Sequence, residues 1–273
     1  MTMTYRDLTT LEEFAAVVDL EREIWGPGYD EVVPVPILAV TVMRGGILVG
    51  AFVDDRMIGF VYSLPGIKDG KPTQWSHMLG VVDSFRSAGV GHQLKALQRE
   101  RALAMGLRLI EWTYDPMQAM NAHLNFAKLG VIVEEYEVNV YGESSSPLHR
   151  GNPTDRFVAA WRVGDARVQD RLRGAAPLAS ALTVEPAGTA QPAGEWLKPA
   201  AIELSLDAKR ISVEIPIGFA QMLSSAPDLA LEWRMATREL FTTYFARGYR
   251  AVEFFLNREA RKGSYLLTRI PNS

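Results

Sequence analysis

An apolar strand-like run, a loop with two glycines and an amphipathic helix follow one another near residue 89, and this junction constrains the fold most. The loop reads FRSAGVGHQL over residues 85–94, after QWSHMLGVV and before a helical repeat that begins at Val90. Glycines let backbone N–H groups curl around an anion without obstruction, and a helix N-terminus adds donors and the positive end of its dipole. The junction therefore predicts an anion-binding strand–loop–helix unit.

Spacing separates the glycine loops that bind phosphates. Gly91 is followed by His-Gln instead of Lys-Ser or Lys-Thr, which excludes a P-loop, and Leu94 stands where a dinucleotide fingerprint needs glycine. The pattern R/Q-x-x-G-x-G/A is matched at every position of 86–91. A glycine-rich turn without a ligand is the simpler alternative, so the flanking elements must decide between the two.

The periodicity of the chain predicts its organisation. Residues 1–163 alternate strand-like and helical patterns, including a helix capped by Thr10 and Glu13 and another that begins at Asp115-Pro116 and ends at Gly130. We expect an α/β (α+β) fold with a mixed central sheet flanked by helices. Residues 164–201 are rich in Ala, Pro and Gly and predict a linker. Residues 202–273 predict a smaller strand–helix–strand half-domain that packs on the first part or on a partner chain, which leaves a homodimer open.

Composition excludes several classes of function. The net charge of −3 leaves no basic surplus, so nucleic acid is not an expected partner. The absence of cysteine excludes disulfides and thiolate zinc sites, and the four histidines lack metal spacing, so we expect no metal. An apolar run of ~18 residues, as a membrane span needs, is missing. We expect a soluble cytoplasmic protein that does not act at a membrane.

The order of elements carries a resemblance to a family. A hairpin, then SHMLGVVDSFRSAGVGHQLKALQRERALAMG, a strand, MQAMNAHLNFAKLG and a further strand resemble the GNAT superfamily of acyl-CoA-dependent N-acyltransferases over residues 4 to about 163. The resemblance implies that the strand ending at Val82 splays from the strand at 109–114, with pantetheine between them and the diphosphate on the loop amides. The cofactor-binding residues so implied are Leu79, Gly80, Val81 and Val82, then Arg86, Ser87, Ala88, Gly89, Val90, Gly91 and His92, and Asn121, Asn125 and Lys128 on one polar stripe of the second helix.

Two residues are candidates for proton transfer from an amine. His77 lies on the strand before the loop, on the same face as Leu79 and Val81 if the strand alternates regularly, and an imidazole can accept a proton near neutral pH. Glu111 stands mid-strand among apolar residues, where a carboxylate is either paired or tuned for proton transfer. A hydrogen-bonded core histidine is the alternative interpretation of His77.

The chain also departs from the family it resembles. Many members carry a tyrosine acid where this sequence has Phe126, and phenylalanine cannot donate a proton to a departing thiolate. Either Tyr114 or a water then replaces it, or backbone dipoles stabilise the thiolate. Phe126 thus keeps open the alternative of a non-catalytic acyl-CoA-binding or regulatory module.

The acceptor is expected to be a small primary amine, in particular an amino acid. Trp25, Trp112 and Tyr114 are candidates for an apolar wall around it, and Arg156 for a carboxylate-binding fork, against the alternatives of plain core aromatics and an Asp155–Arg156 pair. HMLGV, WTYDPMQAMNAHLNFAKLG and NPTDRF resemble a GNAT-like group that includes succinyl-CoA:D-amino-acid N-succinyltransferases. The acyl-CoA donor implied is acetyl-CoA or succinyl-CoA.

Overall fold

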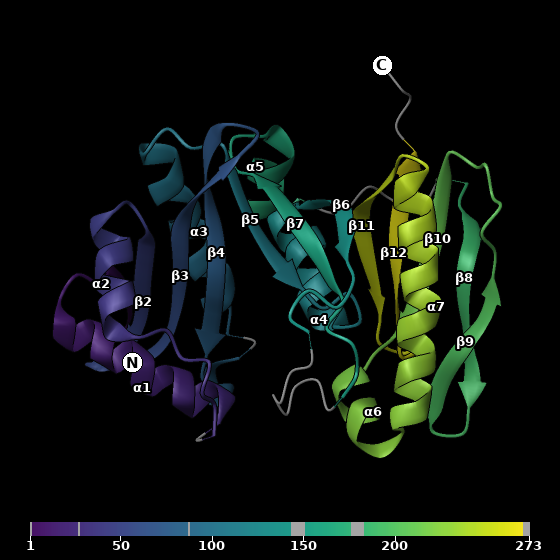
Figure 1. The fold of residues 1–273 in the computed structure, drawn as a ribbon, viewed down its shortest axis with the longest axis horizontal. Helices are drawn as coiled ribbons and strands as arrows, with labels where there is room; N and C mark the ends of the chain where they lie inside the picture. The colour runs from purple at the N-terminus through teal and green to yellow at the C-terminus, as the bar shows by residue number, and fades with distance from the viewer. Residues whose placement is uncertain (1, 27, 87, 143–150, 176–182, 270–273) are drawn as a thin grey trace. The chain divides into compact units, whose positions relative to one another are not determined.

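A computed structural model describes residues 2–26, 28–86, 88–142, 151–175 and 183–269 (Figure 1). The chain forms two compact units. Unit 1 runs from the N-terminus to Trp112 and includes Arg162–Asp165, and unit 2 contains Thr113–Trp161 and the chain from Ala166 onward. These units differ from the domains expected to end at residues 163 and 201. The strands at 132–137 and 156–162 belong to the same sheet as the C-terminal strands, so they fall in unit 2.

Unit 1 contains the strand–loop–helix junction. Its elements are β1 (Met3–Asp7), α1 (Leu11–Trp25), α2 (Val35–Met43), β2 (Ile47–Val53), β3 (Arg56–Lys68), β4 (Lys71–Val81), the 3-10 turn η1 (Asp83–Phe85), α3 (Val90–Ala104) and β5 (Leu109–Tyr114), whose last two residues belong to unit 2. The strands are ordered β1-β2-β3-β4-β5, and every neighbouring pair is antiparallel except β4 and β5, which are parallel.

Helices cover both faces of this sheet. A Cβ at Gly80 of β4 would meet Ile24 and Trp25 of α1, whereas a Cβ at Gly59 of β3 would meet Leu94 of α3. Since Phe60 pairs with Gly80 in the register of β3 and β4, Gly59 and Gly80 face opposite sides. α1 therefore lies on one face and α3 on the other, and the expected mixed sheet flanked by helices is confirmed.

Helix α1 begins where its sequence predicts. Thr10 accepts from the backbone N–H of Glu13 at 3.3 Å, and the Glu13 carboxylate accepts from the N–H of Thr10 at 3.0 Å, so the capping box is present. The buried face of the helix contains Phe14, Val17 and Val18, and it also contains Glu21.

Unit 2 also contains parallel and antiparallel strands together with helices. Its elements are α4 (Ala119–His123), the π-helical segment η2 (Leu124–Leu129), β6 (Ile132–Glu137), β7 (Arg156–Arg162), α5 (Ala166–Leu172), β8 (Glu185–Ala193), β9 (Trp196–Ile202), β10 (Arg210–Pro216), α6 (Phe219–Ser225), α7 (Pro227–Ala246), β11 (Tyr249–Asn257) and β12 (Lys262–Arg269). The strand order is β7-β6-β11-β12-β10-β8-β9, and the long helix α7 packs on one face of these strands and runs along them (Figure 1).

The expected linker at 164–201 is ordered in its described part, which is a correction. It contains α5, β8 and most of β9, and β8 pairs in parallel with β10. Ala187 is fully buried, and a Cβ at Gly188 would lie 2.6 Å from a methyl carbon of Leu240 on α7. β8 therefore needs small residues where α7 packs closely against it. Their abundance resembles the composition of a linker.

The helix expected from Asp115 begins later. α4 starts at Ala119, and the Asp115 carboxylate accepts from the N–H of Met117 at 2.9 Å in the turn before it. Gly130 ends the helical segment in the left-handed conformation with φ 74°, as predicted. The π-helical winding of η2 places Asn125 in the interior while Asn121 and Lys128 are exposed, so these three do not form one polar stripe.

Candidate functional site

Strands β4 and β5 pair over a short stretch and then part. The parallel ladder joins Gln74 to Ile110 and Trp75 to Glu111, whereas β4 continues to Val81, paired to β3 alone. In the described part of unit 1, the half of β4 after Trp75 thus has an edge without a neighbouring strand, as the resemblance implies.

The backbone groups on this edge can be assigned. The N–H of Val82 donates to the carbonyl of Ile58 on β3 at 3.0 Å, so alternate residues back along β4 direct their groups the other way. Leu79 and Val81 therefore face the open edge. Consistently, Nε of Arg86 donates to the carbonyl oxygen of Val81 at 3.3 Å, and Arg86 also pairs with Asp83 at 2.8 Å. Arg86 holds the end of β4 in place beside the loop.

The two glycines of the loop have different roles. Gly89 is the N-cap of α3 and has φ 81°, a left-handed conformation that favours glycine. Gly91 has no such constraint, and a Cβ there would lie 3.7 Å from Leu79 and 4.0 Å from Val81, which is ordinary contact. Neither packing nor backbone geometry thus requires a glycine at position 91. It keeps a space open above Leu79 and Val81, beside amides of the first helical turn that have no intrahelical acceptor.

The other loop residues that were predicted are placed as follows. Ala88 donates its N–H to the carbonyl of Phe85 at 3.3 Å, Val90 is buried, and His92 is half-buried in the first turn of α3. Ser87 lies outside the described residues.

His77 occupies a β-bulge. Tyr62 pairs with Met78 and Ser63 with Ser76, so His77 is an extra residue on β4. Its ring meets the Tyr62 ring edge-on, with centroids 6.0 Å apart, and Tyr62 donates a hydrogen bond to Thr41 of α2 at 2.8 Å. His77 therefore faces the α1–α2 side. The expectation that it shares a face with Leu79 and Val81 is wrong, because the bulge breaks the alternation.

The environment of His77 suits a proton acceptor. Its side chain is exposed, yet the surrounding protein desolvates the imidazolium and lowers its pKa from the ordinary value of 6.5. The imidazole is therefore neutral at physiological pH and can take a proton.

Trp25 lies on the same face of unit 1 as His77. Its indole is half-buried over Gly80 and stacks at a tilt on Tyr29 with centroids 5.4 Å apart. This aromatic pair lies at the C-terminal end of α1, next to the part of β4 that does not pair with β5.

Glu111 and Trp112 lie at the point where the strands part. The Glu111 carboxylate accepts from Nζ of Lys68 at 2.6 Å, so it has a cationic partner. Trp112 faces α3, and its ring lies 3.6 Å from Nζ of Lys95, whose pKa burial lowers well below the ordinary value. Glu111 thus fits a paired structural carboxylate better than an isolated base.

Sequence reasoning missed Glu21. This residue of α1 has no exposed surface, and one carboxylate oxygen accepts from the N–H of Val33 at 2.9 Å. The other oxygen is buried without a hydrogen-bond partner among the described residues. Desolvation raises its pKa from 4.5 to about 7 against the lowering effects of Val33 and Arg22. Its spacing from Phe14, Val17 and Val18 on the apolar face was the available signal.

In unit 2, Tyr114 and Phe126 are core residues. The Phe126 ring is fully buried and meets the Tyr265 ring edge-on at 5.7 Å. The Tyr114 hydroxyl is buried near Tyr265 and Asn125 without a hydrogen bond of regular geometry in the described part of the chain, and burial raises its pKa well above 10. A phenol that holds its proton so tightly is a weak acid.

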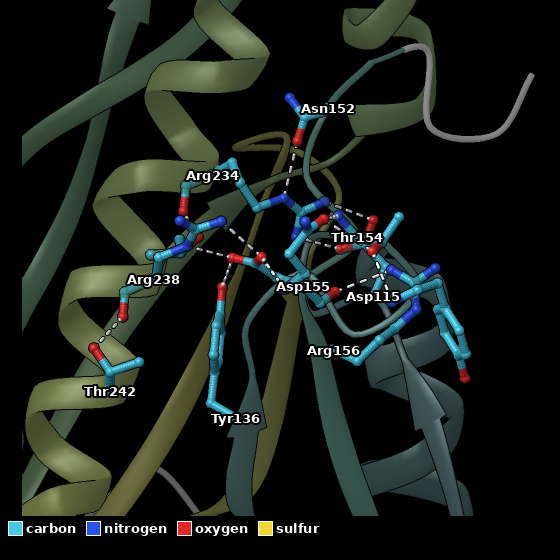
Figure 2. A network of polar contacts seen from close by, with 12 residues as sticks. Asp115, Tyr136, Asn152, Thr154, Asp155, Arg156, Arg234, Arg238 and Thr242 are labelled. Atoms are coloured by element: carbon cyan, nitrogen blue, oxygen red, sulfur yellow. Dashed lines mark hydrogen bonds and ion pairs between the residues drawn. The ribbon is translucent and has the colours of Figure 1, made fainter. Parts of the chain in front are cut away.

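Arg156 belongs to a cluster of charged residues in unit 2 (Figure 2). Asp115 forms two hydrogen bonds of 2.8 Å with Arg234, and Asp155 forms two of 2.8 Å with Arg238. Arg156 donates to the backbone carbonyl of Asp155 at 3.0 Å. The anticipated Asp155–Arg156 side-chain pair is therefore replaced by Asp155–Arg238. Three guanidinium groups and two carboxylates meet here, and Arg156 is 9% exposed.

Burial alone would raise the pKa of Asp115 and Asp155. The neighbouring groups reverse this effect, with Arg234 the largest influence on Asp115 and Arg238 on Asp155, so both pKa values lie below the ordinary 3.8. These carboxylates are ionised and compensated.

The described residues contain no group of three or more His, Asp or Glu side chains that could hold a metal ion. Within the same ranges, no helix has both the length and the apolar character that crossing a bilayer requires.

Comparisons with known proteins place the chain beside acetyltransferases of known structure. No family model and no curated protein matches the sequence. The ribosomal-protein-S18-alanine N-acetyltransferase from Escherichia coli is 14% identical with a TM-score of 0.48, over 60% of this chain and 96% of that chain. YncA from Salmonella typhimurium with its cofactor acetyl-CoA is 15% identical with a TM-score of 0.49, over 60% and 96%. Aminoglycoside 6'-acetyltransferase type Ii is 19% identical with a TM-score of 0.47, over 60% and 99%. At these values the likeness says only what the chain is similar to.

Proposed function

We propose that this chain is an acyl-CoA-dependent N-acyltransferase that moves an acyl group to a primary amine by direct attack. One observation carries the proposal. Part of β4 extends beyond its pairing with β5. It leads to the N-terminus of α3 through a loop that contains a glycine in the left-handed conformation. A strand edge with open amide groups fits an extended amide-bearing arm, and the helix N-terminus fits a diphosphate.

The residues that would hold acyl-CoA lie in chain order along this track. Leu79 and the N–H of Val81 offer backbone groups to the pantetheine amides, and the amides from residues 89 to 92 surround the diphosphate. The space above Gly91 lets the ligand backbone approach the helix. When bound, acyl-CoA supplies an activated thioester.

His77 acts on the acceptor amine in this proposal. It takes a proton from the amine nitrogen, so that the nitrogen lone pair can form the new N–C bond while the C–S bond breaks. Phe126 and Tyr114 do not supply a proton to the leaving sulfur, the first for lack of a hydroxyl and the second because of its raised pKa. We assign that proton to solvent.

Within this class we propose succinyl transfer to an amino acid, which rests on the resemblance of the sequence. Both partners then carry a carboxylate, and a buried carboxylate needs a cation. Arg156 is the guanidinium we would test, because Asp115 and Asp155 keep Arg234 and Arg238 when it is removed.

A non-catalytic acyl-CoA-binding module is the second candidate, which the missing tyrosine at Phe126 favours. Measuring CoA binding beside acyl transfer to a panel of amines separates the two. Binding without turnover of any amine would support the module.

Gly91→Glu tests the site itself. Because Gly91 is neither strained nor crowded, the variant should fold, yet its carboxylate should lower CoA affinity by about 100-fold or more. Gly91→Ala is the matched control, since its methyl group makes ordinary contact. Calorimetry that finds equal CoA affinity in the native protein and folded Gly91→Glu would overturn the proposal.

Arg156→Met tests the donor. If the succinyl assignment holds, the native protein should prefer succinyl-CoA over acetyl-CoA by about 100-fold in kcat/KM, as one charged hydrogen bond of ~3 kcal/mol allows. The variant should lose most of this preference and keep its use of acetyl-CoA. Equal use of both donors by the native protein would end the succinyl assignment and leave acyl transfer intact.

A further inference from the structure

Glu21 is a buried acid whose charge the fold does not use. The side chain has no exposed surface, one oxygen accepts from Val33, and the other has no hydrogen-bond partner among the described residues. A glutamine would hold the Val33 N–H equally well through its carbonyl oxygen, without the cost of burying an ionisable group. Anchoring of Val33 therefore does not explain why this residue is an acid.

The charged and titratable groups around Glu21 do not neutralise it. Arg22 follows it on α1 but is half-exposed and directs its guanidinium to Asp19 at 3.4 Å. Tyr29 and Tyr62 stay neutral, because burial raises their pKa values from 10, that of Tyr29 to about 12. His77 lies beyond, against the Tyr62 ring.

The surroundings match what an ammonium group requires. One turn after Glu21, the rings of Trp25 and Tyr29 are half-buried on the same side of unit 1. Aromatic faces together with a carboxylate bind organic ammonium ions through cation–π contacts and a charge-assisted hydrogen bond. Residues 28–34, which contain Val33, must move to admit such a ligand.

We propose that Glu21 binds the ammonium group of the acceptor amine, with its oxygen that Val33 does not occupy, and delivers it to His77 across Tyr62. This inference rests on the proposed acyltransferase function and adds the residue that selects a cationic acceptor. Glu21 is thus a binding residue, and His77 is the proton acceptor.

Steady-state kinetics with an amine panel at saturating acyl-CoA test the assignment. Glu21→Gln should raise KM for the amine by about 10- to 100-fold, the range of a charge-assisted hydrogen bond, while kcat changes by less than that and CoA affinity is unchanged. Glu23→Gln is the matched control, because Glu23 carries the same charge on the same helix but pairs with Arg56 at the surface. An unchanged amine KM in Glu21→Gln overturns the assignment, as does a loss confined to kcat.

The native protein offers a second test that needs no variant. Glu21 must be ionised to hold an ammonium, so KM for the amine should rise as the pH falls below about 7. An amine KM that is flat from pH 8 to pH 6 overturns the proposal while acyl transfer stands. Absence of turnover with every amine would remove the acyltransferase function, and this assignment with it.

Discussion

Asp115 and Asp155 in unit 2 and Glu21 in unit 1 are buried carboxylates with opposite surroundings. In unit 2, Asp115 and Asp155 each face a guanidinium with two hydrogen bonds, and their pKa values are lowered. In unit 1, Glu21 has a single N–H from Val33, and its pKa is raised to about 7. Asp115 and Asp155 are thus held by ion pairs within the fold, whereas Glu21 makes no ion pair among the described residues, which fits the proposed binding of an ammonium group.

The stability that Asp115 and Asp155 contribute should therefore change with pH in the opposite direction to the stability that Glu21 contributes. A lowered folded pKa gives stability that is present above the ordinary carboxyl pKa and is lost as the pH falls through the folded value. A raised folded pKa does the reverse, since the folded state binds more protons between 4.5 and about 7, so stability declines as the pH rises through that window.

Asp115→Asn should have the largest effect. It leaves the guanidinium of Arg234, which is 1% exposed, without its ionic partner, and breaking a buried pair in this way costs about 3–5 kcal/mol. Urea unfolding at neutral pH measures the loss. A cost below ~1 kcal/mol would mean that the Asp115–Arg234 pair does not stabilise the fold. It would contradict the role that the comparison gives to the carboxylates of unit 2.

Glu21→Gln should have a smaller effect of the opposite sign. Because it removes the ionised form from the interior, we expect it to raise the free energy of unfolding at pH 8 by about 1–3 kcal/mol. The gain should shrink towards pH 5, where Glu21 is protonated in the folded protein. Thermal melting of both proteins across this range measures it, and a destabilised variant at pH 8 would show that the charge contributes to the fold.

Asp19→Asn should have the smallest effect. Asp19 pairs with Arg22 at 3.4 Å with both side chains largely in solvent, and such pairs contribute little. We expect no measurable shift in melting temperature at physiological salt. A clear loss would indicate that Arg22 needs Asp19 to stay away from Glu21, which would sharpen the account of unit 1.

Local signals in the sequence were sufficient for several features of both units. The capping box of Thr10, the glycine at 89 and the helix end at Gly130 are short-range features, and the structure has all three. Interactions between distant residues were not predictable in this way. Arg234 lies 119 residues from Asp115 and Arg238 lies 83 from Asp155, and no local pattern indicates either pair.

Two further features were missed for different reasons. The bulge at His77 inserts one residue into an otherwise regular strand, which leaves no trace in composition. The alanines and glycines of residues 164–201 are typical of a linker, whereas Gly188 is small because Leu240 lies against it. In both cases the cause is a partner on another element.

The bulge at His77 also bears on how the chemistry of this protein could change over time. A residue in regular register has a partner across the ladder, so substituting it disturbs a cross-strand pair. His77 is the extra residue in its ladder, between the pairs made by Ser76 and Met78. Mutation can therefore sample other side chains at this position with little loss of sheet stability, and unit 1 can acquire a new reactivity there while keeping its core sequence.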